Sequence, residues 1–276
     1  MENSRYRGRL APTPSGLLHV GHAQTFKTAW ERARSRGGKI ILRIEDIDTG
    51  RCKKKYADAA IEDLKFIGLD WDEGPDVGGE YAPYLQSERF GYYWSLVEKL
   101  SELGCVYPCD ASRAQVKTLG KKQAHAFDFA EPETIFPNEL RRRVCSSKNV
   151  EKPSGRNWRF AVPEGASVTF TDGNFGEMTF RAGEDFGDFL VWRKAGEPSY
   201  ELAVTADDAA MKITEVVRGK DLLLSTARQI LLYWALGFDI PQFFHCPLLT
   251  DERGEKLSKS SMEKSGGNGR LIRSRK

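Results

Sequence analysis

The 276-residue sequence predicts an α/β fold, in which a parallel sheet carries helices on both faces. Three observations predict it. The Pro- and Gly-rich turn APTPSG leads into a helical pattern, the apolar run KIILRIEDID follows that pattern, and a second helical pattern comes next. Strand, turn, helix, strand and helix in this order begin a parallel sheet with right-handed crossovers.

The spacing of apolar residues places each element of the first hundred residues. Such residues recur at helical intervals from about residue 22 to 35, and two glycines then end the pattern where a C-terminal glycine is expected. KIILRIEDID is an apolar run that ends in acids, as a buried parallel strand does. A second helix is expected through Ile61 and Leu64, and ERFGYYWSLVEKLSELG predicts a third that ends at Gly104.

The sequence changes character between Asp110 and about Glu184. This stretch is polar and interrupted by prolines, and VTFTD and MTFRA then alternate on either side of DGN, which is the signal of a hairpin. We interpret it as an insertion made partly of antiparallel strands. Beyond it, DFLVWRKAGEPSYELAVT has strand character, ITEVVRG predicts a short strand, and LSTARQILLYWALG predicts a helix.

Composition limits the kind of protein. With 40% hydrophobic and 29% charged residues, the chain is expected to be globular, with one large domain or two small ones. No apolar run approaches the ~20 residues that span a bilayer. The N-terminal MENSRYRGRL also lacks the apolar middle of a signal peptide, so we expect a cytoplasmic protein without a membrane partner. Five scattered cysteines favour reduced thiols over a disulfide framework.

Two stretches point to a phosphate ligand. LLHVGHAQTF places His19, Gly21 and His22 at the first strand-to-helix turn, where backbone N–H groups and the helix dipole favour an anion. EKLSKSS places Lys256 and Lys259 in a loop that can bring ammonium groups to a polyphosphate. Taken alone, the histidines could be a surface pair or two metal ligands, and the lysines a solvated turn. Neither G-x-G-x-x-G nor G-x-x-x-x-G-K-[ST] occurs.

HVGH and KLSKS together resemble the two signatures of the class I aminoacyl-tRNA synthetases, whose catalytic core is a Rossmann-like parallel sheet. More narrowly, the chain resembles the catalytic domain of the glutamyl-tRNA synthetase family over most of residues 5 to 260. The matching segments, in order, are RLAPTPSGLLHVGHA, GGKIILRIEDID, YLQSERFGYYWSLVEKLSELGCVYPC, SYELAVTADDAAMKITEVVRGKDLL and EKLSKS. The segments GDFLVWR, SYELAV and VVRGKDLLLSTARQILL, and the short length, resemble the short branch of this family, which attaches glutamate to queuosine in tRNA(Asp).

This resemblance implies a glutamate pocket. Arg9 and Glu45 would bind the carboxylate and ammonium ends of the amino acid, because a charged ligand that leaves water needs charged partners. Arg218 would be a second cation for a substrate with two carboxylates. The other residues that the resemblance places around the pocket are Ala11, Thr13 and Tyr200.

The same resemblance implies an ATP site. His19 and His22 would stabilise the α-phosphate and the leaving pyrophosphate, with Gly21 allowing a close approach of the nucleotide. Lys256 and Lys259 would do so from a mobile loop. The glutamate α-carboxylate attacks ATP in line, so positioning and electrostatic stabilisation supply the catalysis. Magnesium is implied as the partner of the ATP phosphates, with no protein ligand assigned to it.

The insertion departs from the family pattern at a zinc site. The family often has Cys-x-Cys after a tyrosine-proline pair, whereas YPCDAS keeps Cys109 and has Ala111 in the second position. Downstream, Phe136 and Leu140 stand where tyrosine and cysteine would be expected. Because a structural zinc site needs four ligands, we expect no metal here. Packing around FDFAEPETIF is expected to replace the metal's contribution to folding.

Domain boundaries follow from the same comparison. We expect residues 1–109 and 185–246 to form the two halves of the catalytic core, 110–184 an inserted subdomain near the acceptor RNA, 247–260 the KLSKS loop and 261–276 a basic, disordered tail. The family continues into a helical domain that reads the anticodon, and the sequence has no apolar periodicity after residue 260. Two explanations stay open: the tRNA is presented differently, as activity on the anticodon base would require, or the enzyme is shortened and impaired.

The expected function is ATP-dependent activation of glutamate and its transfer to queuosine in the anticodon loop of tRNA(Asp), by a monomer. The basic residues 141 to 143 would help to hold RNA phosphates. Three alternatives stay open: a shortened glutamyl-tRNA synthetase that charges tRNA(Glu), a non-catalytic glutamate- or RNA-binding relative, and a small nucleotidyltransferase. Retention of both phosphate signatures argues against the second, and the glutamate pocket argues against the third.

Overall fold

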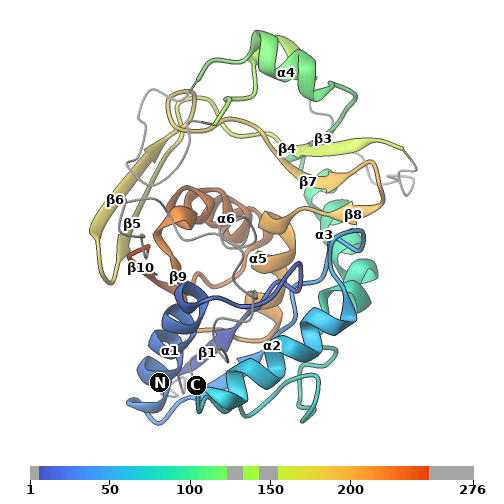
Figure 1. The fold of residues 1–276 in the computed structure, drawn as a ribbon. Helices are drawn as coiled ribbons and strands as arrows, with labels where there is room; N and C mark the ends of the chain where they lie inside the picture. The colour runs from blue at the N-terminus through green and yellow to red at the C-terminus, as the bar shows by residue number, and fades with distance from the viewer. Residues whose placement is uncertain (1–5, 123–132, 143–154, 249–276) are drawn as a thin grey trace, which may run out of the picture. The chain divides into compact units, whose positions relative to one another are not determined.

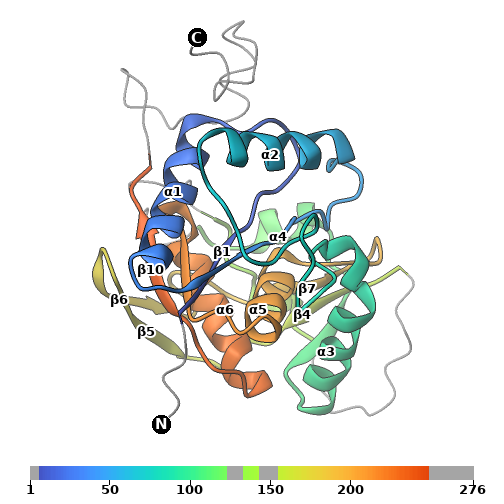
Figure 2. The same ribbon diagram turned by 90° about the horizontal axis from the view of Figure 1, so that it is seen from below.

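The computed structural model describes residues 6–122, 133–142 and 155–248, which form two compact units (Figures 1 and 2). Among these residues, the first unit takes in 6–89, 210–220 and 241–248, and the second takes in the rest. The chain therefore leaves the first unit and returns to it twice. Within the described ranges, no helix combines the length and the hydrophobicity that crossing a bilayer requires.

The first unit is built on parallel strand pairs. Its elements are β1 (Arg7–Leu10), α1 (Val20–Arg34), β2 (Lys39–Leu42), α2 (Lys54–Phe66), η1 (Gln86–Arg89), β9 (Glu215–Gly219) and β10 (Gln242–Cys246). β1 pairs with β2 and β9 pairs with β10, both in parallel. The backbone N–H of Thr214 donates to the carbonyl of Arg7 at 2.9 Å, which places the start of β9 beside β1. The predicted α/β class is thus confirmed.

One apolar cluster holds this unit together. It joins Leu10 of β1 and Leu42 of β2 to Ala29 of α1, Leu64 of α2 and Val217 of β9. Helix α1 packs against β1, β2 and β9, as Figure 2 shows for the blue helix and strand. Both predicted helices are confirmed, because their apolar stripes are the faces that this cluster buries.

The strand predicted over KIILRIEDID is shorter than expected. Its ladder with β1 ends at Leu42, after which the next three backbone N–H groups bond to the end of β1 and to two loops. Arg43 donates to Leu10, Ile44 to Tyr84, and Glu45 to Pro12, at 2.9, 2.9 and 3.0 Å. The acidic end of the predicted strand is therefore a loop that is tied to the segment following β1.

The second unit combines helices with antiparallel strands. Its elements are α3 (Phe90–Glu102), β3 (Val106–Cys109), α4 (Arg113–Leu119), η2 (Asn138–Leu140), β4 (Asn157–Phe160), β5 (Ser167–Asp172), β6 (Gly176–Arg181), β7 (Phe189–Arg193), β8 (Glu197–Pro198), α5 (Tyr200–Ala210), η3 (Lys220–Leu222) and α6 (Leu223–Leu236). Strands β3, β4, β7 and β8 form one antiparallel sheet in that order, and β5 and β6 form the predicted hairpin.

The strand character predicted for SYELAVT is wrong, because this segment begins helix α5. The Ser199 side chain accepts the N–H of Leu202 at 3.2 Å, and its carbonyl accepts the N–H of Ala203 at 3.0 Å. Residues 201 to 208 are all buried. A helix that is buried all round has no amphipathic period, so spacing could not distinguish it from a buried strand.

Candidate active site

The two histidines of HVGH form a reciprocal cap at the N-terminus of α1. The Nδ1 atom of His19 accepts the backbone N–H of Gly21 at 3.1 Å, and the Nδ1 atom of His22 accepts the backbone N–H of His19 at 3.3 Å. The two ring centroids lie 3.7 Å apart. Because each Nδ1 is an acceptor, each ring is neutral and carries its proton on Nε2. Both Nε2–H groups are therefore hydrogen-bond donors.

Gly21 suits the close packing of this cap. A Cβ atom at this position would lie 3.0 and 3.1 Å from ring atoms of His19. The glycine thus lets the His19 ring lie against the first turn of the helix. An imidazole N–H donor and the positive end of the helix dipole are brought together there, and both favour a phosphate.

Two buried charges lie where β2 ends. The guanidinium of Arg43 donates from Nη2 to Oε1 of Glu45 at 3.0 Å, and the two residues are 0% and 5% exposed. Arg43 Nη1 also contacts the sulfur of Met211 at 3.9 Å. The Glu45 carboxylate is therefore ionised beside a fixed cation, with its backbone tied to Pro12 of the loop after β1.

Two more buried guanidinium groups stand on β1 and β9. Arg9 donates from Nη1 to the carbonyl of Val217 at 2.8 Å, and Val217 is the residue before Arg218. Arg218 donates from Nε to Nε2 of His245 on β10 at 3.2 Å. Arg9 and Arg218 are each 4% exposed. Both arginines thus lie close to the carboxyl ends of their strands, in the same unit as Glu45.

Arg9, Glu45, Arg218 and the histidine cap all belong to the first unit. Ala11 is half-buried and Thr13 is exposed, both in the loop that follows β1. Tyr200 is the half-buried first residue of α5 and belongs to the second unit. Lys256 and Lys259 lie outside the described residues, as does most of the KLSKS loop.

Sequence reasoning missed Arg43 and His245. Arg43 did give a signal, because a lone arginine within the apolar run KIILRIED needs a buried partner, and Glu45 is the nearest acid. His245 gave none, since FFHCP matched no signature in the sequence.

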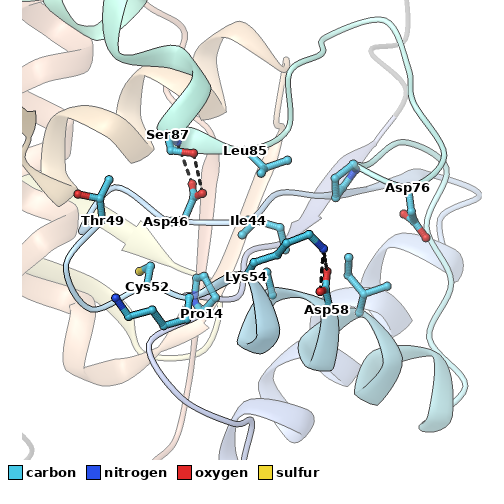
Figure 3. A pocket seen from close by; sticks show the side chains of 14 residues that line it. Pro14, Ile44, Asp46, Thr49, Cys52, Lys54, Asp58, Asp76, Leu85 and Ser87 are labelled. Carbon is cyan, nitrogen blue, oxygen red and sulfur yellow. Dashed lines mark hydrogen bonds and ion pairs between the residues drawn. The ribbon is translucent and has the colours of Figure 1, made fainter.

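A pocket of about 440 Å³ opens beside the loop that carries Glu45 (Figure 3). Ile44 and Asp46 line it, whereas Glu45 between them does not. Asp46 accepts both the N–H and the hydroxyl of Ser87, at 2.8 and 2.7 Å. Lys54 and Asp58, also in its wall, pair at 2.8 Å. The pocket is therefore distinct from the group of Arg43 and Glu45, and these polar side chains already bind one another.

The positions that correspond to the family's zinc ligands form an apolar cluster. Cys109 and Phe136 are buried in a cluster with Tyr107, and Ala111 and Leu140 pack against it. Three of the four positions thus carry side chains that cannot coordinate a metal, so this site does not fit zinc. Of the stretch expected to supply packing, Ile135 and Phe136 are buried, and residues 127 to 132 lie outside the described part.

A polar network supports the same insertion. Asp188 accepts the hydroxyl of Tyr107 at 2.6 Å and the N–H of Val162 at 2.8 Å, and its carboxylate lies 3.2 Å from Arg141. Burial raises the pKa of the Asp188 carboxyl above its ordinary value, despite these partners. Arg141, expected to face RNA, is therefore held internally. Arg142 pairs with Asp110 at 2.8 Å, and residue 143 lies outside the described part.

Comparisons with known proteins identify the family of the chain. Residues 5–268 match the model of the family described as tRNA synthetases class I (E and Q), catalytic domain. The Glutamyl-Q tRNA(Asp) synthetases of Symbiobacterium thermophilum and Nitratidesulfovibrio vulgaris are 46% and 44% identical, over 91% and 92% of this chain and 77% of each relative. The glutamate-tRNA synthetase structure from Elizabethkingia anophelis superposes with a TM-score of 0.79 at 30% identity.

The fold is that of a class I aminoacyl-tRNA synthetase catalytic domain. Within that class, the chain belongs to the family of the glutamate and glutamine enzymes. The resemblance inferred from the sequence motifs is thus confirmed. The chain covers 54% of the Elizabethkingia anophelis synthetase, about half of its length.

Proposed function

We propose that the chain is an ATP-dependent ligase that activates glutamate as glutamyl-adenylate and transfers it to queuosine in the anticodon loop of tRNA(Asp). The observation that carries the activation of glutamate is the set of buried charges at the strand ends. Transfer to tRNA(Asp) is supported by two relatives named for tRNA(Asp), each with more than 40% identity over nine-tenths of the chain.

The buried charges suit glutamate. Arg9, Arg43 and Arg218 contribute three positive charges against the single negative charge of Glu45. Glutamate brings two carboxylates and one ammonium group. In this proposal Arg9 binds the α-carboxylate, Glu45 binds the ammonium group and Arg218 binds the side-chain carboxylate, with Ala11, Thr13 and Tyr200 lining the pocket. Each charge of the ligand then has a partner of opposite sign.

The histidine cap suits the phosphates of ATP. The Nε2–H groups of His19 and His22 would donate to the α-phosphate and to the leaving pyrophosphate, while the glutamate carboxylate attacks the α-phosphorus in line. Gly21 keeps the His19 ring against the helix N-terminus. Lys256 and Lys259 of the KLSKS signature would add positive charge as pyrophosphate departs, and magnesium would accompany ATP.

Transfer of radiolabelled glutamate tests the proposal. The protein is incubated with ATP, magnesium and one of three RNAs: queuosine-containing tRNA(Asp), queuosine-free tRNA(Asp) or tRNA(Glu). We expect label only on the first. Label on queuosine-free tRNA(Asp) would contradict the role of queuosine, and absence of label from all three would contradict transfer.

Charging of tRNA(Glu) is the second candidate, because the Elizabethkingia anophelis protein is a glutamate-tRNA synthetase that shares the fold. This chain covers only 54% of that protein. Label on the 3′ end of tRNA(Glu) would identify this activity. Exchange of pyrophosphate into ATP that requires glutamate would exclude a purely non-catalytic relative.

A further inference from the structure

A buried histidine stands beside the arginine that the proposed function assigns to the substrate side chain. His245 and Arg218 are paired positions on the parallel strands β10 and β9. The Nε–H of Arg218 donates to Nε2 of His245 at 3.2 Å, and the histidine is 0% exposed. The proposed function leaves His245 without a role.

This hydrogen bond fixes a tautomer and an orientation. Because Nε2 accepts, the His245 ring is neutral and carries its proton on Nδ1. A guanidinium group is rigid and planar, so holding Nε sets the plane and the direction of both terminal nitrogens. The ring of Phe243 lies against both partners, 5.8 Å from the Arg218 guanidinium and 6.4 Å from the His245 ring.

We propose that His245 is a positioning residue that aims the Arg218 guanidinium at the side-chain carboxylate of glutamate and thereby sets the preference for glutamate over glutamine. This rests on the proposed function. Paired N–H groups bind a carboxylate well only when their plane and direction match it. A misdirected Arg218 would still be a cation, but it would lose much of this geometric advantage.

Three variants separate positioning from packing. His245→Leu removes the acceptor, and His245→Gln returns an oxygen close to the place of Nε2. Phe244→Leu is the matched control: Phe244 is the adjacent residue on β10 and contacts the Arg32 guanidinium at 3.9 Å, away from Arg218. Glutamate-dependent exchange of pyrophosphate into ATP, with tRNA present, gives KM for glutamate, glutamine and ATP, and thermal melting reports folding.

We expect His245→Leu to raise KM for glutamate on the order of ten- to a hundredfold, the value of one hydrogen bond to a charged group. KM for ATP should stay as in the wild type, and discrimination against glutamine should fall. His245→Gln should restore most of the affinity for glutamate. Phe244→Leu should leave all three KM values unchanged.

The inference is overturned if His245→Leu behaves like Phe244→Leu, or if it raises KM for ATP as much as KM for glutamate. It is also overturned if glutamate and glutamine are affected equally, since the role would then be structural. Failure of the proposed function is recognised separately, because the wild type itself would then show no glutamate-dependent exchange.

Discussion

Arg43 and Glu45 form a buried ion pair, with Nη2 and Oε1 3.0 Å apart, only two residues from each other in the chain. The side chains are 0% and 7% exposed. Burying one of these charges alone would be costly, so the pair is retained as a unit. Glu45 therefore presents a negative charge whose position is set by Arg43 before any ligand arrives.

Replacing Arg43 by Met should destabilise the protein and weaken glutamate binding. Removing one member of a buried ion pair costs roughly 3 to 5 kcal/mol, because the other charge is left uncompensated. Urea unfolding and KM for glutamate measure the two effects. Arg51→Met is the control, since Arg51 pairs with Asp48 at the surface with 75% of its side chain exposed. Equal stability of the two variants would contradict this account.

Replacing Arg218 by Gln should reduce the use of glutamate far more than that of glutamine. Glutamine lacks the second negative charge, so it loses less when the cation is removed. Leaving a polar group unsatisfied in a buried pocket costs a few kcal/mol, a factor on the order of a hundred in kcat/KM. Pyrophosphate exchange with each amino acid tests this. If kcat/KM falls equally for glutamate and glutamine, Arg218 does not bind the side-chain carboxylate.

Two substitutions of His19 should separate its structural role from its catalytic one. Asparagine is a good N-cap, so His19→Asn should preserve stability, whereas His19→Ala should cost about 1 kcal/mol. Both lack the imidazole Nε2–H, and both should lower the rate of pyrophosphate exchange by a factor on the order of a hundred or more. Melting and kinetics are measured on the same samples. Full activity in His19→Asn would show that Nε2–H does not stabilise the phosphates.

Glu215 should make stability depend on pH. Burial alone would raise the pKa of this carboxyl, but hydrogen bonds from Arg32, Tyr6 and Arg36 outweigh it and lower the pKa below its ordinary value of 4.5. A lowered pKa in the folded state means that the stabilisation is present above pH 4.5 and is lost as pH falls through the lowered value.

Glu215→Gln should therefore unfold more easily than the wild type at neutral pH, by about 3 kcal/mol, and the difference should shrink in acid. Urea titrations across this pH range measure it. Glu31→Gln is the control, because Glu31 lies on the surface with 56% of its side chain exposed. A difference that stays constant down to pH 3 would rule out Glu215 as the titrating group.

The apolar cluster of the insertion should be stable without metal. Phe136→Ala should lower the free energy of unfolding by about 3 to 5 kcal/mol, as removal of a buried aromatic ring usually does. Leu119→Ala, in the same insertion but 51% exposed, should cost little. Chelators should not change the melting temperature of the wild type. A melting temperature that drops with chelator and recovers with zinc would show that metal binds after all.

The sequence predicted most where a pattern has one physical meaning. Helices α1 and α2 were predictable because each buries one apolar stripe. Helix α5 was not, since burial on all sides removes its period. The cap formed by His19 was also beyond prediction, because its tautomer depends on where the N–H of Gly21 points. The position of His245 depends on strand pairing between distant segments.

The order of the segments along the chain governs when the first unit can form. Arg9 reaches the carbonyl of Val217 across 208 positions, and the N–H of Arg7 reaches Thr214 across 207. On the ribosome, β1 and β2 emerge well before β9 and β10. The helices and antiparallel strands of the second unit, by contrast, have partners that are close in sequence. Until then the edge of β1 lacks its hydrogen bonds to Thr214, so the nascent chain exposes a strand edge that can aggregate. Synthesis must pass residue 246 before this catalytic domain exists.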